Sequence, residues 1–240
     1  MYGWRGRIGV LIGGGNRVVE AELPRLVPKG VSCHFSRLSY PEISEQGISS
    51  MLSGLEDSAR LLAGGPNSLE AEVIALAHAT ASSSRPGADT ELIGRIRKTC
   101  GVPATTTLTA VTEGLRHLGV HRVSAALPYD KPERSAQLKN FLEGNGFRVE
   151  KMKNGPYVAG HEVSSQPPSN AYRLLRDADA PASEAIVMTI PNFRTIEVIQ
   201  DLEDDLGKPV VTGNQATAWA CLGILGIKET IGGFGRLLRA

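Results

Sequence analysis

Short apolar runs alternate with longer stretches of helical periodicity from one end of the chain to the other. The apolar runs predict eight strands, at residues 7–12, 32–37, 72–77, 102–105, 122–127, 147–151, 184–189 and 209–212. Apolar residues at helical spacing predict helices at residues 17–26, 48–62, 90–100, 110–118 and 132–143. The strands around Ile74 and Ile186 are almost uniformly apolar, which is typical of strands covered on both faces. The alternation therefore predicts an α/β protein with parallel sheets flanked by helices.

Several short sequence motifs recur in the same order a little more than 100 residues later, and we call these matched motifs landmarks. Gly101-Val102-Pro103 has a counterpart in Gly207-Lys208-Pro209, 106 residues later, and Glu72 and Glu184 stand 112 residues apart. A repeat of this length indicates two similar lobes rather than a solenoid. We therefore predict two pseudo-symmetric lobes, each a four-stranded parallel sheet flanked by helices, with the active site in the cleft between them. The predicted lobes are residues 1–107 with 214–240, and residues 108–213.

Charge and cysteine content narrow the class of protein. Lysine and arginine total 26 against 25 aspartates and glutamates, so the formal net charge of +1 leaves no electrostatic footprint for nucleic acid or an anionic membrane. No apolar run approaches the roughly 20 residues of a transmembrane helix. The three cysteines, Cys33, Cys100 and Cys221, are too few and too scattered for a disulfide framework or a tetrahedral zinc site. We expect a cytoplasmic protein without a metal or another cofactor.

Ligands bind beyond the carboxyl ends of parallel strands, so the loops that follow strands are the candidate sites. Gly13-Gly14-Gly15-Asn16 follows the first strand, and glycines let backbone amides approach an anion. The run is not GxGxxG and has no acidic residue about 20 positions on, so it does not indicate a nucleotide cofactor. Asn16 either caps the next helix or binds a substrate carboxylate.

His78 and a run of hydroxyl side chains follow the most apolar strand of the first half. A histidine at a strand end can take and return a proton near neutral pH. The hydroxyls of Thr80 and Ser82 can donate hydrogen bonds to a carboxylate or an oxyanion. The alternative is a polar loop beside a histidine of the core.

Tyr129 lies in the turn Pro128-Tyr129-Asp130-Lys131-Pro132, which follows the strand predicted at 122–127 in the second half. Its hydroxyl either donates to a carboxylate, or the turn serves only to let Asp130 cap the helix that follows. A stretch rich in Gly, Ser and Pro at 155–169 carries His161 and Glu162. It is either a mobile flap over the cleft or an ordinary surface loop.

The loop after the apolar strand near Ile186 carries Asn192 and Arg194 among apolar neighbours. Arg194 either clamps an anion through two parallel hydrogen bonds or pairs with Glu197 on the surface. Both interpretations place a polar group at the carboxyl end of a strand.

Short motifs run through nearly the whole chain. They are Arg7-Ile8-Gly9, Asn16, Glu20-Ala21-Glu22-Leu23-Pro24, Phe35-Ser36-Arg37, Glu72-Val73-Ile74-Ala75-Leu76-Ala77, Gly101-Val102-Pro103, Asn192-Phe193-Arg194-Thr195, Asn214-Gln215-Ala216 and Gly233-Phe234-Gly235-Arg236-Leu237. In this order they resemble the aspartate/glutamate racemase superfamily. The similarity is greatest to the branch that holds maleate isomerase, arylmalonate decarboxylase and the ectoine-utilisation racemase-like proteins.

The resemblance implies an active site between two facing lobes and a small carboxylate substrate, held by backbone amides, hydroxyls and an asparagine. Soluble enzymes of this kind often form symmetric oligomers, so a homodimer or homotetramer is expected. The catalytic residues are then His78 and Tyr129. The substrate-binding residues are Gly15, Asn16, Ala79, Thr80, Ser82, Ile190, Pro191, Asn192, Arg194 and Asn214.

The resemblance also implies one catalytic cysteine after the third strand of each lobe, and here these positions are His78 and Ile190. Two-base racemisation needs a proton-transfer group on both faces of a carbon, and Ile190 supplies none. Thiol attack on a double bond has no nucleophile either, so an isomerase of the two-thiol type is disfavoured. We expect a cofactor-independent lyase in which His78 catalyses acid–base chemistry from one side. The alternatives are a hydrolase of a small amide, imide or lactone in which His78 activates water, and a non-catalytic carboxylate-binding protein.

Overall fold

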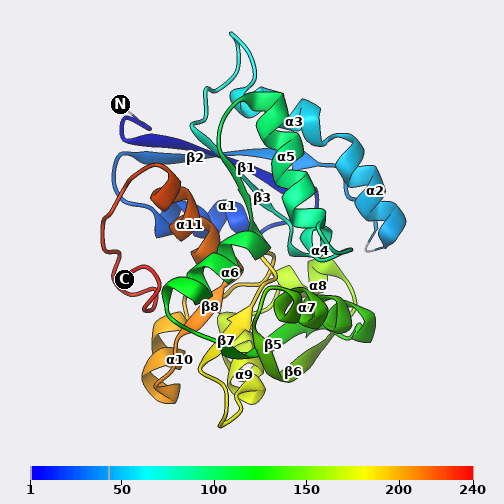
Figure 1. Cartoon of the computed structure of the whole chain (residues 1–240), viewed down its shortest axis with the longest axis vertical. Coiled ribbons are helices and arrows are strands. Elements are labelled where there is room, and N and C mark those ends of the chain that lie inside the picture. Colours follow the sequence, from blue (N-terminus) through cyan, green and yellow to red (C-terminus); the bar gives the residue numbers. More distant parts are fainter. Residues whose placement is uncertain (1, 43, 240) are drawn as a thin grey trace.

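Two four-stranded parallel sheets form the framework of the chain, one in each lobe (Figure 1). The computed structural model describes residues 2–42 and 44–239. The first sheet has the order β2-β1-β3-β4 and the second has the order β6-β5-β7-β8, which confirms the predicted fold class. The strands are β1 (Gly6–Gly13), β2 (Val31–Leu38), β3 (Val73–Ala77), β4 (Ala104–Thr106), β5 (Arg122–Tyr129), β6 (Arg148–Tyr157), β7 (Ala185–Met188) and β8 (Val210–Thr212).

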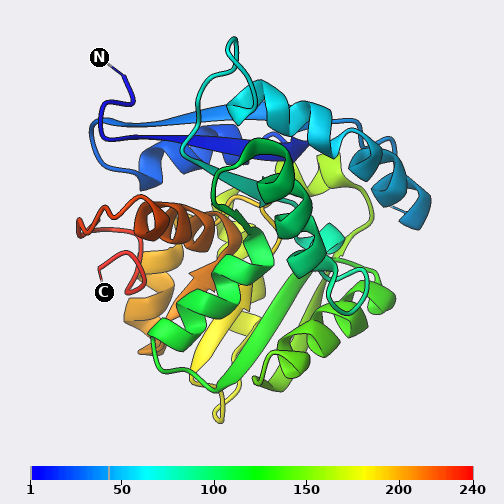
Figure 2. The ribbon, with the colours of Figure 1, turned by 45° about the horizontal axis from the view of Figure 1, so that its top comes forward.

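Helices connect the strands and cover the faces of both sheets (Figure 2). The α-helices are α1 (Val19–Glu22), α2 (Glu45–Ser53), α3 (Leu55–Ala63), α4 (Ala79–Ser82), α5 (Ala88–Cys100), α6 (Thr107–His117), α7 (Pro132–Gly144), α8 (Gly160–Ser164), α9 (Pro168–Ala178), α10 (Ile199–Leu206) and α11 (Gly213–Ile224), and a 3₁₀-helix η1 spans Leu23–Leu26. None of the described helices combines the length and the hydropathy needed to cross a membrane.

Three predicted segments differ from the structure. The helix predicted at 48–62 is two helices, α2 and α3, which meet at Gly54. The helix predicted at 17–26 is one turn of α1 followed by η1, with Pro24 in its first turn. The stretch 155–169 is not a single irregular loop, because β6 continues to Tyr157 and α8 follows it.

The two lobes repeat the same local contacts, which explains the landmarks in the sequence. Glu72 accepts a hydrogen bond from the backbone N–H of Arg7 (2.9 Å), and Glu184 accepts one from the backbone N–H of Arg122 (2.9 Å). In both lobes, the glutamate that precedes the third strand therefore accepts a hydrogen bond from the start of the first strand. Gly101 and Gly207 end the equivalent helices α5 and α10 with left-handed backbone (φ 70° and 68°), a conformation that favours glycine.

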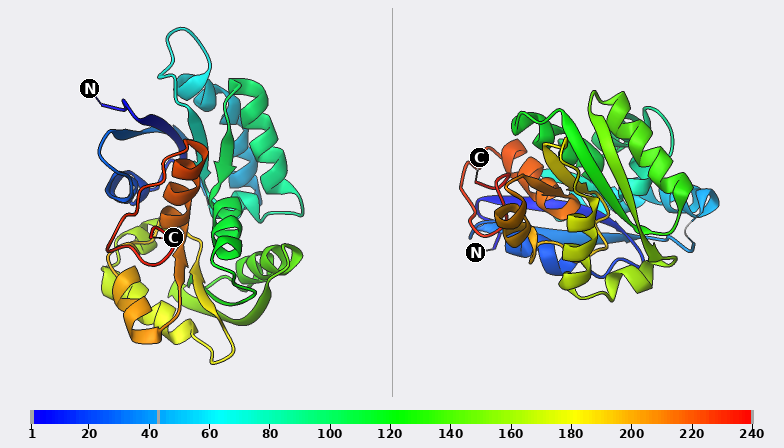
Figure 3. Two further views of the ribbon diagram at one scale, coloured as in Figure 1. Left: turned by 60° about the vertical axis from the view of Figure 1, so that its left-hand side comes forward. Right: turned by 90° about the horizontal axis from the view of Figure 1, so that it is seen from below.

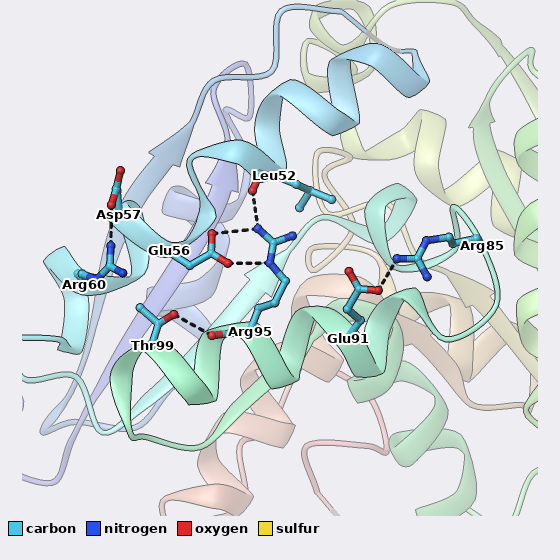
Figure 4. Close-up of polar contacts among 8 residues, drawn as sticks. All are labelled: Leu52, Glu56, Asp57, Arg60, Arg85, Glu91, Arg95 and Thr99. Atoms are coloured by element: carbon cyan, nitrogen blue, oxygen red, sulfur yellow. Dashed lines mark hydrogen bonds and ion pairs between the residues drawn. The ribbon is translucent and has the colours of Figure 1, made fainter.

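Strand β3 of the first sheet is buried on both faces, as its apolar sequence predicts. In β3, Val73 and Ala75 belong to the large core cluster shared by the two lobes, while Ile74 and Leu76 belong to a second cluster with α2, α3 and α5. Arg95 on α5 adds a bidentate ion pair with Glu56 on α3 (2.7 and 2.9 Å) and donates to the carbonyl of Leu52 (2.8 Å), as Figure 4 shows. These contacts join α5 to α2 and α3 on the face of the first sheet that lies away from the second lobe.

The helices α6 and α11 pack against each other between the lobes (Figures 1 and 3). Each of them contacts strands of both sheets, namely β3, β4 and β8. The predicted division assigned residues 214–240 to the first lobe, and this segment contacts both lobes. Arg5 of the first lobe forms an ion pair with Glu229 (2.6 Å). The backbone N–H of Arg236 donates to Glu203 on α10 of the second lobe (2.8 Å), and Leu237 packs on Gly114 of α6. Residues 225–229 therefore lie against the first lobe, whereas residues 236 and 237 contact the second lobe and α6.

Candidate active site

A cavity of about 740 Å³ lies where the carboxyl ends of the two sheets face each other. The loops after β1, β3, β5 and β7 all contribute to its wall, as the strand order predicts. Residues 40–42, α7 and the start of α8 complete the wall. Its volume falls within the usual range of small-molecule sites, about 300–1,000 Å³.

His78 lines this cavity directly after β3, and its ring is oriented by the short helix that follows. The ring atom Nδ1 accepts a hydrogen bond from the backbone N–H of Ala81 (3.2 Å). A ring nitrogen that accepts from an N–H group carries no proton, so the neutral imidazole has its proton on Nε2. No described residue accepts a hydrogen bond from Nε2, which leaves Nε2–H as the free donor of the ring.

The environment of His78 keeps the imidazole neutral. Burial, together with the nearby Arg134 guanidinium, lowers the pKa of His78 to about 4. Tyr40 packs edge-on against the ring, with the ring centroids 4.7 Å apart. A Cβ atom at Gly13 would lie 3.3 Å from the ring, so the glycine keeps room for the imidazole. His78 is therefore a neutral hydrogen-bond donor throughout the neutral pH range.

The lowered pKa of His78 predicts a pH-dependent contribution to the free energy of unfolding. Because the pKa falls from 6.5 to about 4 on folding, the unfolded chain binds the proton more strongly, and the stability falls as the pH drops through this window. The loss should reach at most about 3 kcal/mol near pH 4. Urea denaturation of the wild type and of His78→Gln at pH 8, 6 and 4.5 measures it, and the difference in stability between the two proteins should change with pH. A constant difference would contradict the prediction.

Asn16 lines the cavity and caps the following helix, the first of the two roles that the sequence left open. Its Oδ1 atom caps α1 by accepting from the backbone N–H groups of Val18 (2.9 Å) and Val19 (3.0 Å). Its Nδ2 group donates to no described residue and remains available to a ligand. The neighbouring Gly15 also lines the cavity, and a side chain there would meet open space.

Asn192 and Ile190 line the cavity from the second lobe, together with Pro191. The Asn192 side chain bridges the lobes, because Oδ1 accepts from the backbone N–H of Arg17 (3.0 Å) and Nδ2 donates to the carbonyl of Gly160 (3.0 Å). It closes this part of the cavity, and one N–H of its amide group has no acceptor among the described residues. Ile190 presents an aliphatic surface after β7, in the lobe opposite His78.

Thr80, Ala79 and Tyr129 line the cavity, whereas Ser82 does not. The one-turn helix α4 points Ser82 into the core, where its side chain is fully buried and its hydroxyl has no partner among the described residues. The predicted role of Ser82 in substrate binding is therefore not supported. Burial raises the pKa of Tyr129, so that its hydroxyl stays protonated and can donate to an anion.

Arg194 and Asn214 also lie outside the cavity. The Arg194 side chain is exposed and pairs with Glu197 (3.0 Å), the surface alternative that the sequence left open. The Asn214 Nδ2 group is buried and donates to Glu22 (2.6 Å) and to the carbonyl of Pro191 (3.0 Å). Asn214 therefore supports the loop that carries Ile190 and does not face a ligand.

Glu22 is the buried partner of this loop and was not predicted as a site residue. It lies at the end of α1 and accepts hydrogen bonds from the backbone N–H of Thr195 (2.9 Å) and from Asn214. Burial raises the pKa of Glu22 to about 7. Its motif was visible in the sequence, but its partners lie more than 170 residues away along the chain.

His161 and Glu162, the two candidate residues of the stretch 155–169, have different places in the structure. His161, at the start of α8, lines the cavity. Glu162 instead accepts hydrogen bonds from the backbone N–H groups of Val158 (2.9 Å) and Ala159 (3.2 Å), and caps the helix outside the cavity.

None of the three cysteines lines the cavity. Cys33 lies within β2, Cys100 ends α5 and Cys221 is fully buried in α11. Burial raises the pKa of each thiol. Within residues 2–42 and 44–239, no three His, Cys, Asp or Glu side chains come together as a metal site would require.

The chain is similar over nearly its whole length to known enzymes of two kinds, arylmalonate decarboxylase and maleate isomerase. The chain is 28% identical over 237 residues to the arylmalonate decarboxylase of Bordetella bronchiseptica, covering 96% of this chain and 95% of that protein. It is 25% identical over 255 residues to the maleate isomerase of Nocardia farcinica, covering 97% and 95%. A solved structure of the Nocardia farcinica isomerase, a Cys-to-Ser mutant with a covalently bound succinylcysteine intermediate, superposes with a TM-score of 0.87 at 24% identity and 98% coverage of both chains.

These relatives are enzymes that share one fold but catalyse two different reactions, a decarboxylation and an isomerisation. The family model of arylmalonate decarboxylase matches residues 8–238, which is nearly the whole chain. The resemblance in the sequence motifs is thereby confirmed, and the chain belongs to the arylmalonate decarboxylase family.

Proposed function

We propose that this protein is a cofactor-independent lyase that decarboxylates a substituted malonate, with His78 as the proton donor on one face of the reacting carbon. The observation that carries the proposal is the state of the His78 ring, whose Nδ1 is engaged by Ala81 and whose Nε2–H is free at the cavity. Loss of CO₂ leaves a carbanion, and this strong base needs a proton donor rather than a base.

The reaction balances with the groups at the cavity. The bond to one carboxylate breaks, CO₂ leaves, and the electron pair delocalises into the retained carboxylate as an enediolate. The carbon then takes the Nε2 proton of His78, which leaves an imidazolate. Water returns a proton to Nε2, and the hydroxide that this forms leaves to solvent. The free amide of Asn16 and the hydroxyls of Thr80 and Tyr129 donate to the retained carboxylate, where the charge develops. Each donor of this kind contributes about 10²–10³-fold to the rate.

The thiol route of the isomerases has no support in this chain. The structure of the Nocardia farcinica isomerase holds a succinylcysteine, which requires a cysteine beside the substrate. Here His78 and Ile190 occupy the strand ends that face the cavity, and the three thiols lie elsewhere. We therefore infer that maleate is not isomerised by this protein.

A hydrolase has no support from the geometry either. To activate water, the free nitrogen of His78 would have to accept a proton. In this structure the accepting nitrogen is Nδ1, and it already binds the N–H of Ala81.

The test is turnover of phenylmalonate and alkylmalonates in D₂O, followed by CO₂ release and NMR of the product. We expect CO₂ together with one deuterium at the α-carbon and a single product enantiomer. Maleate, measured in parallel, should give no fumarate. Fumarate formation, ¹⁸O incorporation from labelled water into an opened amide, imide or lactone, or ligands that bind without any turnover would each contradict the proposal.

A further inference from the structure

Cationic side chains dominate the cavity wall, although the whole chain has a net charge of only +1. Four of them line it, from both lobes, and these are Arg17, Arg37, Lys131 and Arg134. Glu42 is the single carboxylate of the described residues in the wall. The cavity wall therefore has four cationic groups against one carboxylate, a net positive charge that exceeds the two negative charges of a malonate.

The four cations differ in how far other groups already neutralise them. Arg37 pairs with Glu20 and donates to the carbonyls of Gly14 (2.8 Å) and Asn16 (2.8 Å), so it supports the loop after β1. Arg17 is exposed at the rim. These two arginines are thus either structural or solvated.

Arg134 is half-buried and has no carboxylate partner among the described residues. Its guanidinium donates only to the amide oxygen of Gln137 on the same helix (3.2 Å). The helix that carries it, α7, lies close to α4 across the cleft (Figures 1 and 2). Arg134 lines the same cavity as His78, Tyr40 and Tyr129. Its charge contributes to the lowered pKa of His78.

A half-buried guanidinium without a counter-ion is costly unless a ligand supplies one. Arginine presents its donors as a planar fork that binds carboxylate or phosphate through two hydrogen bonds. Lys131, one turn earlier, also lines the cavity and lacks a carboxylate partner among residues 2–42 and 44–239. Arg134 and Lys131 together are suited to bind an anionic group in addition to the two carboxylates of the malonate.

We propose that Arg134 binds a third anionic group of the substrate, beyond the two carboxylates of the malonate, so that the site selects malonates whose side chain ends in a carboxylate or a phosphate. The inference rests on the proposed function for the identity of the reacting end. The leaving carboxylate cannot be the group that Arg134 holds, because a strong ion pair with that group would stabilise the ground state against loss of CO₂. The retained carboxylate is bound by Asn16, Thr80 and Tyr129 in the proposed function. The group that Arg134 binds is therefore the distant end of the side chain, and the volume of about 740 Å³ leaves room for it.

The experiment compares the binding of glutarate, pentanoate and 4-phosphonobutanoate by isothermal titration calorimetry. The wild type should bind one of the two dianions about 10- to 100-fold more tightly than pentanoate, since a charge-assisted bidentate pair contributes this much. Arg134→Gln should abolish this preference and leave the dissociation constant of pentanoate within about two-fold, while Arg134→Lys should keep part of it. The tighter dianion distinguishes a carboxylate from a phosphate.

The matched control is Arg97→Gln, an exposed arginine on α5 outside the cavity, which should bind like the wild type. A wild type without preference for a dianion, or a preference that persists in Arg134→Gln, would overturn the inference. An equal loss of pentanoate and dianion binding in Arg134→Gln would also overturn it. Binding is measured without turnover, so a protein that releases no CO₂ but shows the Arg134-dependent preference would refute only the proposed function.

Discussion

Replacing His78 with glutamine should lower kcat for CO₂ release by about 10²–10⁴-fold, the usual contribution of a positioned proton donor. Glutamine can still accept from the backbone N–H of Ala81 and can still donate a hydrogen bond into the cavity, so the local structure should persist. An amide is far less able than imidazole to deliver its proton to carbon. Steady-state kinetics on the malonate that is turned over, with KM and kcat determined separately, measures the effect.

The control for this variant is His121→Gln, an exposed histidine outside the cavity whose side chain is not part of the site. It should retain wild-type kinetics. If His78→Gln retained kcat within about ten-fold, His78 would contribute less than about 1.4 kcal/mol, and the proton would have to come from another group.

Replacing Ile190 with cysteine should destroy the stereochemical purity of the product. Ile190 lines the cavity after β7, at the position in the second lobe that corresponds to His78 in the first. A thiol there can protonate the carbanion from the other face, in competition with His78. The partition between the two product enantiomers should change by about ten-fold or more, which corresponds to 1.4 kcal/mol in relative barrier height. Chiral chromatography of the product and the loss of α-deuterium from a labelled product measure the change.

The matched control is Ile190→Ser, which removes the same aliphatic surface without adding a thiol and should keep the wild-type configuration. The double variant His78→Gln/Ile190→Cys should give the opposite enantiomer, because only the second face then carries a donor. Unchanged configuration in both cysteine variants would show that residue 190 does not reach the reacting carbon.

Element positions were largely predictable from the chain because buried parallel strands leave a local signature. All eight strands lie where the apolar runs predict them, and the paired landmarks Glu72 and Glu184 mark the same backbone contact in both lobes. Helix boundaries were less predictable where short-range propensity competes with packing. At Gly54 the apolar periodicity continues across a break between α2 and α3.

Side-chain direction was the weaker part of the prediction. The order of residues along a loop does not state which of them faces the cleft. The Ser82 side chain points into the core from the one-turn helix α4. The Asn214 side chain donates its hydrogen bonds to Glu22 and to the carbonyl of Pro191. Tyr40 and Arg134 were overlooked, since an aromatic residue after a strand and an arginine in a first helical turn are common features of surfaces.

The sequence by itself determined the α/β class, the duplication, the family and the two positions that hold histidine and isoleucine at the ends of β3 and β7. Each of these follows from local periodicity or from the identity of residues at one place in the chain. Only the tertiary structure decided which ring nitrogen of His78 accepts a hydrogen bond, the interlobe role of Asn192 and the unpaired charge of Arg134. These properties depend on burial and on partners from distant segments, which come together only when the two sheets face each other.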